Sequence, residues 1–457
     1  MTIINSDKIN IILTTAQNFS NEKVREIIAK AAEMRGLKPE EVAVLLNTED
    51  PQLLQEMFSV AAKIKNEIYG ERLVFFAPLY ISDYCVNDCH YCSFHKSNEQ
   101  LKRSKLTTDE IKEQVRVILG MGHKRILLET GEDQDNIQID YIIEAIKTIY
   151  SVQDDKGSRI RRLNVNIAAT TVEDYKRLKA SKIGTYQLFQ ETYHRPTYEK
   201  LHVGGPKENY DRQITANDRA FEAGIDDFGL GVLFGLYDYK FEVLALVEHA
   251  RYLDEKHGVG PHTISVPRFQ PAETVTYQPE YPVSDADFLK LIAILRLAVP
   301  YTGMILSTRE SPELRAQAFK LGISQASAAS RTSPGGYSQT TEGKQFSLSD
   351  HRTLDEVIHS ILKQKLLPSF CTACYRLGRT GHDFMGLAKD GHIQTYCRPN
   401  GLLTFQEYLE DYASLAVKRL GEGVIQQYVS RIKEEQLRNE TCARLEKIKN
   451  GERDLYF

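Results

Sequence analysis

Apolar residues recur with two different periods along this chain, and the change of period divides it into three segments. Up to about residue 70, apolar positions such as Val24, Ile27 and Ile28 lie three or four residues apart, which predicts amphipathic helices. From about residue 71, short β-rich runs alternate with amphipathic stretches, and beyond about residue 350 this alternation stops. We therefore expect a helical extension over 1–70, a central domain over 71–350 and a mostly helical C-terminal domain over 351–457.

Eight β-rich runs lie in the central domain, and helical stretches separate them. Strand and helix in alternation, joined by right-handed crossovers, produce a parallel sheet. Eight repeats over about 260 residues match the size of a closed (β/α)8 TIM-type barrel, in which active sites lie where the strands end. An open doubly wound sheet is the structural alternative. The runs are 73–81, 125–129, 163–168, 185–189, 226–233, 262–266, 303–307 and 323–327.

Composition and charge narrow the class of protein. With 457 residues, 42% of them hydrophobic, the chain can bury a sizeable core. Its formal net charge of −4 gives no electrostatic footprint for nucleic acid or an anionic membrane, so small-molecule chemistry is expected. No apolar run approaches the roughly 20 residues that span a bilayer, and the N-terminus lacks the order of a signal peptide. We expect a cytoplasmic protein.

Six of the seven cysteines fall into two groups, which is typical of reduced thiols that bind metal. The first group, Cys85, Cys89 and Cys92, follows the first β-rich run. Three thiolates on one loop can each bind a different iron of a cubane [4Fe-4S] cluster, which leaves the fourth iron open. A structural zinc site and a disulfide knot are the alternatives. Cys442, in a charged stretch, is expected to be a bystander.

The second group, Cys371, Cys374 and Cys397, has the spacing C-x2-C-x22-C. These three thiolates would again leave one iron of a cubane open. Zinc is the serious alternative here, because His382 or His392 could supply a fourth ligand. Beside the first group, a second iron-sulfur cluster is the better interpretation.

The ends of the seventh and eighth runs carry polar side chains that suit an amino acid substrate. Arg309 follows the seventh run together with Ser307, and Ser327 ends the eighth run. An arginine at a barrel strand end is a natural clamp for a carboxylate, although this one could instead pair with Glu310. His262 opens the sixth run, and a lone histidine there is more often structural than a ligand.

The first cysteine group, with Tyr91 just before its last cysteine, resembles the cluster loop of radical S-adenosylmethionine (SAM) enzymes. The resemblance implies a [4Fe-4S] cluster that binds SAM at its open iron and cleaves it reductively to a 5′-deoxyadenosyl radical. It also implies that residues after the second and fourth runs contact SAM, with an arginine suited to its carboxylate. These implied SAM contacts are Tyr91, Thr130, Gly131, Glu132, Glu191 and Arg195.

Taken together, the motifs resemble the HydG family, the radical SAM tyrosine lyases of [FeFe]-hydrogenase maturation, over nearly the whole chain. The ThiH family, which are tyrosine lyases of thiazole biosynthesis, shares the barrel segments but lacks the C-terminal cysteine motif. The second cysteine group therefore decides between the two families. The motifs that carry the resemblance are 84–92, 189–194, 262–268, 306–310 and the cysteines at 371, 374 and 397.

The HydG resemblance implies cleavage of the tyrosine Cα–Cβ bond to p-cresol and dehydroglycine, then formation of carbon monoxide and cyanide on an iron-cysteine complex at the second cluster. Arg309, with Ser307 and Ser327, would hold the tyrosine, and His262 would bind an extra iron. The implied partners are SAM, L-tyrosine, cysteine, iron, an electron donor such as ferredoxin or flavodoxin, and other hydrogenase maturases. The alternatives are a ThiH-like lyase that stops at dehydroglycine and a non-catalytic two-cluster electron-transfer or scaffold protein.

Overall fold

Four helices precede the first strand in the computed structural model, which describes residues 3–339 and 343–457. They pack against the later helices α11 (Tyr239–His257), α12 (Asp285–Ala298) and α13 (Pro312–Leu321). Asp50 caps the last of the four by accepting hydrogen bonds from the amides of residues 52 and 53, and Pro51 occupies the first helical position. The four helices are α1 (Ser6–Thr15), α2 (Asn21–Ala31), α3 (Pro39–Asn47) and α4 (Pro51–Tyr69).

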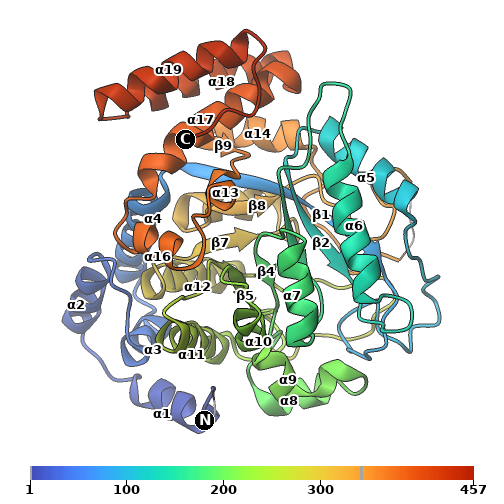
Figure 1. Cartoon of the computed structure of the whole chain (residues 1–457). Coiled ribbons are helices and arrows are strands. Elements are labelled where there is room, and N and C mark those ends of the chain that lie inside the picture. The colour runs from blue at the N-terminus through green and yellow to red at the C-terminus, as the bar shows by residue number, and fades with distance from the viewer. Residues whose placement is uncertain (1–2, 340–342) are drawn as a thin grey trace.

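Eight parallel strands follow and close into a barrel, with helices around the outside (Figure 1). Strand β1 pairs with β8 on one side and with β2 on the other, so the sheet has no open edge there. The predicted (β/α)8 fold is confirmed, and the open doubly wound sheet is wrong. The strands are β1 (Arg72–Ser82), β2 (Arg125–Thr130), β3 (Arg162–Asn166), β4 (Tyr186–Gln187), β5 (Phe228–Gly231), β6 (Thr263–Ser265), β7 (Gly303–Leu306) and β8 (Gln325–Ser327).

The helices between the strands begin where local signals predict them. Thr107 and Glu110, for example, form a capping box at the start of α5. The periodic stretch from residue 210 is divided into two helices at Thr215, whose hydroxyl donates to the carbonyl of Asp211. Besides α11 to α13, these elements are α5 (Thr108–Gly120), α6 (Ile139–Ser151), α7 (Val172–Ala180), α8 (Arg195–Leu201), the 3-10 helix η1 (Pro206–Glu208), α9 (Tyr210–Ile214) and α10 (Ala216–Glu222).

Alternate residues of each strand point into the barrel, which therefore contains successive layers of side chains. Along β2, Ile126 and Leu128 belong to the core outside the barrel, whereas Arg125, Leu127 and Glu129 line cavities inside it. The three inward residues belong to successive layers. Leu127 is part of an apolar cluster, with the cation of Arg125 in the layer before it and the acid Glu129 in the layer after it.

The chain after the barrel attaches to it through a ninth strand, β9 (Leu367–Ser369). This strand pairs in parallel with the first residues of β1, so that Arg72 lies opposite Leu367 and Val74 opposite Ser369. The C-terminal region is therefore fixed to the N-terminal ends of the barrel strands. Its helices are α14 (Leu354–Lys363), α15 (Ala373–Arg376), α16 (Gly381–Lys389), α17 (Gln394–Asp411), α18 (Leu415–Val429) and α19 (Glu435–Lys449).

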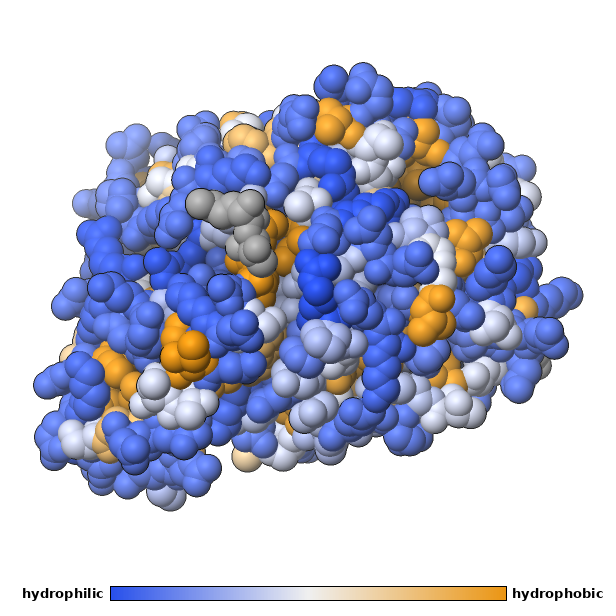
Figure 2. Space-filling model, turned by 90° about the horizontal axis from the view of Figure 1, so that it is seen from below, coloured by the Kyte–Doolittle hydropathy of each residue, from blue (hydrophilic) through white to orange (hydrophobic). Residues whose placement is uncertain are grey.

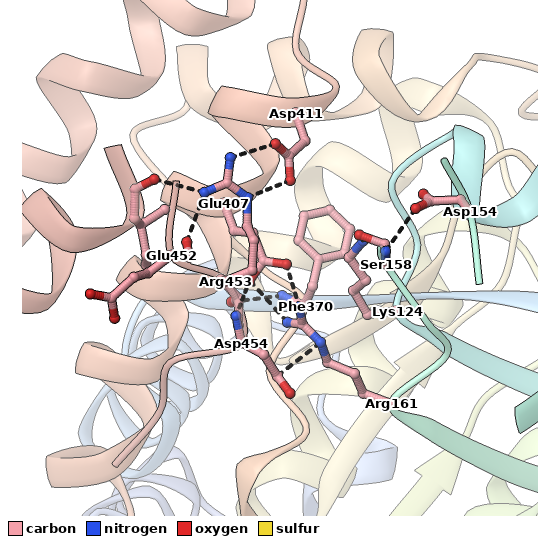
Figure 3. Close-up of polar contacts among 12 residues, drawn as sticks. Lys124, Asp154, Ser158, Arg161, Phe370, Glu407, Asp411, Glu452, Arg453 and Asp454 are labelled. Atoms are coloured by element: carbon pink, nitrogen blue, oxygen red, sulfur yellow. Dashed lines mark hydrogen bonds and ion pairs between the residues drawn. The ribbon is translucent and has the colours of Figure 1, made fainter. Parts of the chain in front are cut away.

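The last described residues return to the barrel and join three parts of the chain. Figure 3 shows Arg161, next to the start of β3, between the carboxylates of Glu407 and Asp454, with Arg453 paired to Asp411. Asp454 also accepts from Arg376 of α15 at 2.6 Å. Because Arg161 and Glu407 are nearly inaccessible to solvent, this network is more rigid than an exposed set of ion pairs.

The surface is mainly hydrophilic in the view of Figure 2, where hydrophobic residues show only in small separate patches. Among the described residues, no helix combines the length and the apolar character that crossing a membrane requires.

A buried histidine makes the stability of this fold depend on pH. The hydroxyl of Tyr193 lies 2.8 Å from Nδ1 of His249, and burial lowers the pKa of this imidazole from 6.5 to about 4. Below pH 6.5 the unfolded chain takes up a proton that the folded chain does not accept until the pH nears 4, so stability falls across this window.

We predict that His249→Asn, which keeps an acceptor for the Tyr193 hydroxyl, is less sensitive to acid than the native protein. Between pH 7 and pH 5 the native protein should lose about 2 kcal/mol more unfolding free energy than the variant. Anaerobic urea unfolding followed by circular dichroism at both pH values measures this difference. Equal losses in the two proteins would show that His249 does not contribute to the acid sensitivity.

Candidate active site and second cysteine site

A cavity inside the barrel, at the C-terminal ends of the strands, collects most of the predicted site residues. Tyr91 and Cys92 of the first cysteine loop face residues from several strand ends across this space. Its polar lining residues include Tyr91, Glu129, Asn166, Gln187, Glu191, Ser307, Arg309 and Ser327. A concave site with a few convergent polar groups on an apolar wall is typical of an enzyme that binds a small molecule.

The first cysteine loop is held in place by neutral and charged hydrogen bonds. The side-chain Nδ2 of Asn87 donates to the carboxylate of Glu132 at 2.6 Å, and its side-chain Oδ1 accepts from the backbone N–H of Lys207 at 2.8 Å. The hydroxyl of Tyr91 lies 2.8 Å from Nε2 of His202, whose Nδ1 lies 2.7 Å from the carbonyl oxygen of Tyr198. These hydrogen bonds tie the loop to the turn after β2 and to the segment 198–207.

The thiols of this loop suit a cluster better than a single ion. Burial raises the pKa of Cys92 to about 11 and raises that of Cys89 well above its usual range, so a cation is needed to keep both as thiolates. In the part of the chain that the structure describes, no three candidate ligands are close enough to hold one metal ion. Ligands to different irons of a cubane are necessarily spread apart, which fits these residues.

The turn after β2 approaches the cysteine loop closely. A Cβ on Gly131 would lie 2.2 Å from the carbonyl oxygen of Tyr84 and 3.1 Å from Cβ of Cys85, so only glycine fits there. Thr130, Gly131 and Glu132 line a neighbouring cleft, in which Glu132 pairs with Arg212 at 2.9 Å. The missing side chain of Gly131 thus makes room for the cysteine loop.

The structure does not bring Arg195 to this site. Its guanidinium donates to both carboxylate oxygens of the exposed Asp211, at 2.5 and 3.2 Å, and lies over the ring of Tyr210. Arg195 is the first residue of α8. Lys207 takes its place beside Glu191, at 2.7 Å. Nothing in the sequence singles out Lys207, which is far along the chain from β4 and has no motif of its own.

Arg309 presents an unpaired cation to the cavity. Glu310, its expected alternative partner, pairs instead with Arg268. Among the described residues no carboxylate lies within ion-pair distance of Arg309, whose guanidinium lies 3.2 Å from the ring centroid of Phe346. The hydroxyl of Ser307 accepts from the amide of Arg309 at 3.4 Å. The guanidinium is thus free to bind an anionic ligand.

Glu129 is a site residue that the sequence pattern did not reveal. It accepts a hydrogen bond from Asn166 at 3.0 Å, and burial raises its pKa to about 8. This acid is therefore largely protonated at neutral pH and can donate a hydrogen bond into the cavity. The alternation of inward and outward residues along β2 could have identified it, because Glu129 lies two residues beyond the inward-facing Leu127.

The second cysteine group lies at the opposite end of the barrel. Cys371 and Cys374 follow β9 and Cys397 belongs to α17, yet all three line one cavity at the N-terminal ends of the strands, together with His262. His382 and His392, the proposed zinc ligands, are not among its lining residues, and His382 instead packs against Gly258. Neither histidine proposed from the sequence therefore supplies the fourth ligand of a closed zinc site.

His262 is oriented for metal binding. Its Nδ1 lies 3.0 Å from Oδ2 of Asp227, and its ring stacks on Phe384 with centroids 3.9 Å apart. With a carboxylate beside Nδ1, Nε2 is the ring nitrogen left available as a ligand. Arg72 donates to Sγ of Cys397 at 3.1 Å, which would stabilise a thiolate. The donor set thus suits an iron-sulfur cluster with one further metal ligand nearby.

Two family comparisons match the barrel. Residues 79–250 match the Radical SAM superfamily, and residues 265–366 match the Biotin and Thiamin Synthesis associated domain. The radical SAM match supports a [4Fe-4S] cluster and SAM at the first cysteine loop.

Curated relatives cover most of the chain. A 2-iminoacetate synthase from Salmonella typhimurium is 31% identical over 350 residues, which are 76% of this chain and 90% of that protein. The [FeFe] hydrogenase maturase subunit HydE from Thermotoga maritima is 26% identical over 294 residues, which are 62% of this chain and 76% of that protein.

Solved structures extend the similarity over the whole chain. A crystal structure of HydG, a maturase of the [FeFe]-hydrogenase, is 55% identical with a TM-score of 0.97 and covers 100% of both chains. The HydG structure from Carboxydothermus hydrogenoformans is 41% identical with a TM-score of 0.85, covering 96% of this chain and 97% of that one. The chain therefore belongs to the HydG family of [FeFe]-hydrogenase maturases within the radical SAM superfamily.

Proposed function

We propose that this protein is a radical SAM lyase that cleaves L-tyrosine between Cα and Cβ. The observation that carries this proposal is the unpaired guanidinium of Arg309 in the cavity that Tyr91 and Cys92 also line. An amino acid carboxylate is the ligand that such a cation binds best, because two parallel N–H groups match its two oxygens. The hydroxyls of Ser307 and Ser327 would then bind the remaining polar groups of the amino acid.

Cys85, Cys89 and Cys92 would hold the cluster, which together with SAM supplies a 5′-deoxyadenosyl radical when both are bound. The residues of the chain bind and orient the reactants around it. Lys207 beside Glu191, and Glu132 beside Arg212, provide charges of both signs for the ammonium and carboxylate of SAM. We propose Tyr91, Thr130, Gly131, Glu132 and Glu191 as SAM-site residues and replace Arg195 with Lys207.

The cavity wall also protects a reactive site from water. Phe76, Leu127 and Ile305 form a buried apolar cluster inside the barrel and line the cavity, so this part of its wall offers no hydrogen bonds to water. Glu129, neutral below its raised pKa of about 8, hydrogen-bonds without repelling the substrate carboxylate. This enclosure favours cleavage of one bond over side reactions of a radical.

At the other end of the barrel, we propose a second cluster on Cys371, Cys374 and Cys397. His262 would hold an additional iron, to which carbon monoxide and cyanide made from the dehydroglycine fragment would be delivered. Free cysteine and iron would be further substrates, with ferredoxin or flavodoxin as electron donor and other maturases as acceptors in the cytoplasm. The HydG relatives support this reading, as do the paired His262 and the buried thiols.

The 2-iminoacetate synthase relative favours a second candidate, a lyase that stops at dehydroglycine. The cavity with three cysteines and His262 has no purpose in that reaction, which is why we prefer the longer one. An electron carrier or scaffold would in turn have no need for Arg309 or its cavity. We keep 1–70, 71–350 and 351–457 as the proposed helical extension, catalytic barrel and second-cluster domain.

Replacing Arg309, the cation proposed to bind the substrate, tests the first half of the proposal. We predict that Arg309→Lys, which loses the two parallel donors, raises KM for tyrosine about 10- to 100-fold. Formation of 5′-deoxyadenosine from SAM should persist, because the cluster loop is unchanged. Anaerobic assays of p-cresol and deoxyadenosine measure both effects. Arg331→Lys, at an exposed arginine, is the matched control; an unchanged KM in Arg309→Lys would refute the assignment.

Replacing two thiols tests the second half. The variant Cys371→Ala/Cys374→Ala should still release p-cresol, because its substitutions lie at the far end of the barrel, but should give no carbon monoxide. Product analysis with a haem protein as the carbon monoxide trap separates the two signals. Cys442→Ala, at the exposed cysteine, should keep both products. Equal loss of p-cresol and carbon monoxide in the double variant would mean that the second site is misassigned.

A further inference from the structure

Glu129 is the carboxyl group without a cation partner in the first cavity, which lies at the C-terminal ends of the strands. Two glutamates line this cavity, and the other, Glu191, pairs with Lys207 at 2.7 Å. Among the described residues, no lysine, arginine or histidine nitrogen lies within 4.0 Å of the Glu129 carboxyl oxygens. Asn166 donates to Oε2 at 3.0 Å, whereas Oε1 has no hydrogen-bond partner in the described part of the chain. Oε1 is therefore available to a ligand.

Arg309 lies near Glu129 without forming an ion pair with it. Burial raises the pKa of Glu129, and the positive charge of Arg309 lowers it, more strongly than the hydrogen bond from Asn166 does. Because Coulomb interactions weaken with distance, the two side chains are neighbours across the cavity. The carboxylate and the amino group of an amino acid are attached to one carbon, so a site that binds both needs a cation and an acid arranged in this way.

The other ionisable groups that face Glu129 already have partners. Tyr80 of β1 lies opposite Glu129 in the strand register, and its hydroxyl donates to Gln345 at 2.7 Å. Glu191, which follows β4, is the paired glutamate described above, and Arg309 is a cation. Glu129 is therefore the facing group that is left to accept a proton from a ligand in this cavity.

We propose that Glu129 binds the amino group of the substrate amino acid and accepts the proton that its ammonium loses before the Cα–Cβ bond breaks. Forming the C=N bond of dehydroglycine uses the lone pair of the nitrogen, which an ammonium group lacks. In the proposed step one N–H bond of the substrate breaks, one O–H bond forms at Oε1 and no electron is transferred. The inference rests on the proposed function, because it assigns a further catalytic residue to the same site.

Substrate binding should release a proton if this assignment is right. Glu129 is largely protonated in the free protein at neutral pH, and a free amino acid carries an ammonium group. Once bound, the carboxyl group and the amino group share one proton, so the second is lost to solvent. With a pKa of about 8 for Glu129, the expected release is about 0.9 proton per site at pH 7.

The test is anaerobic titration calorimetry of the reconstituted full-length protein with SAM, at pH 7 in two buffers that differ in ionisation enthalpy. Without a reductant there is no turnover, so binding is measured alone. L-tyrosine is compared with 3-(4-hydroxyphenyl)propanoate, which keeps the carboxylate and the phenol but has no amino group. Native protein should release about 0.9 proton with L-tyrosine and none with the analogue.

Three variants locate this proton. Glu129→Gln keeps an oxygen for Asn166 but no basic group, so it should release no proton, bind L-tyrosine about 10- to 100-fold more weakly and bind the analogue as native protein does. Glu129→Asp keeps a carboxyl group and should release a proton again. Glu113→Gln, at an exposed glutamate of α5, is the matched control and should behave as native protein.

Several results would overturn the inference. Equal weakening of L-tyrosine and the analogue in Glu129→Gln would mean that Glu129 contacts the phenol or the carboxylate instead. Native proton release in Glu129→Gln would mean that another group accepts the proton. SAM titrated into this variant shows whether its site is folded. The comparison of the two ligands in native protein does not depend on any variant, and an absence of proton release with L-tyrosine there also overturns the inference.

Formation of p-cresol separates this inference from the proposed function. Loss of a general base should lower p-cresol formation by reduced Glu129→Gln at least about 100-fold. Native protein that makes p-cresol but releases no proton on binding L-tyrosine would keep the lyase and overturn the role of Glu129. Native protein that binds L-tyrosine with proton release but makes no p-cresol would refute the lyase and keep Glu129 as the residue that binds the amino group.

Discussion

Strand β1 connects both cysteine sites, and its pairing is the constraint on which the rest of the structure depends. Its first residue, Arg72, donates to Cys397, and its last, Ser82, leads into Cys85. Along its length it pairs with β9 at the start, then with β8, and with β2 at the end. Because consecutive inward residues of one strand enter successive layers, a single register positions the two sites relative to each other.

The two cavities are successive layers of the same barrel interior. Val74, Arg125 and Gln325 line the second cavity, and the residues two positions later on the same strands line the first. Both layers carry largely buried arginines without a carboxylate partner among the described residues, Arg309 at one end and Arg72 and Arg125 at the other. A protein that buries such cations gains specificity for anionic ligands, because each cation costs free energy until a partner compensates its charge.

Local patterns sufficed to predict the barrel and the family but not the arrangement of the sites. Strand-helix alternation and cysteine spacing are encoded in adjacent residues, so the fold and the HydG resemblance followed from them and are confirmed. The end of the barrel that receives the second cysteine group depends on β9, which has three residues and no periodicity of its own. Arg195 pairs with Asp211, a contact that the sequence pattern did not predict, and Lys207 was missed because only the folded chain brings it to Glu191.

The central claim is that one barrel holds two clusters with different roles, one at each end. Iron and sulfide analysis combined with electron paramagnetic resonance of the reduced, anaerobic protein, with and without SAM, tests it most directly. Two cubanes predict about eight irons per chain, or about nine with the additional iron, and two cluster signals of which SAM changes only one. About four irons per chain and a single signal, or two signals that both change with SAM, would contradict the claim.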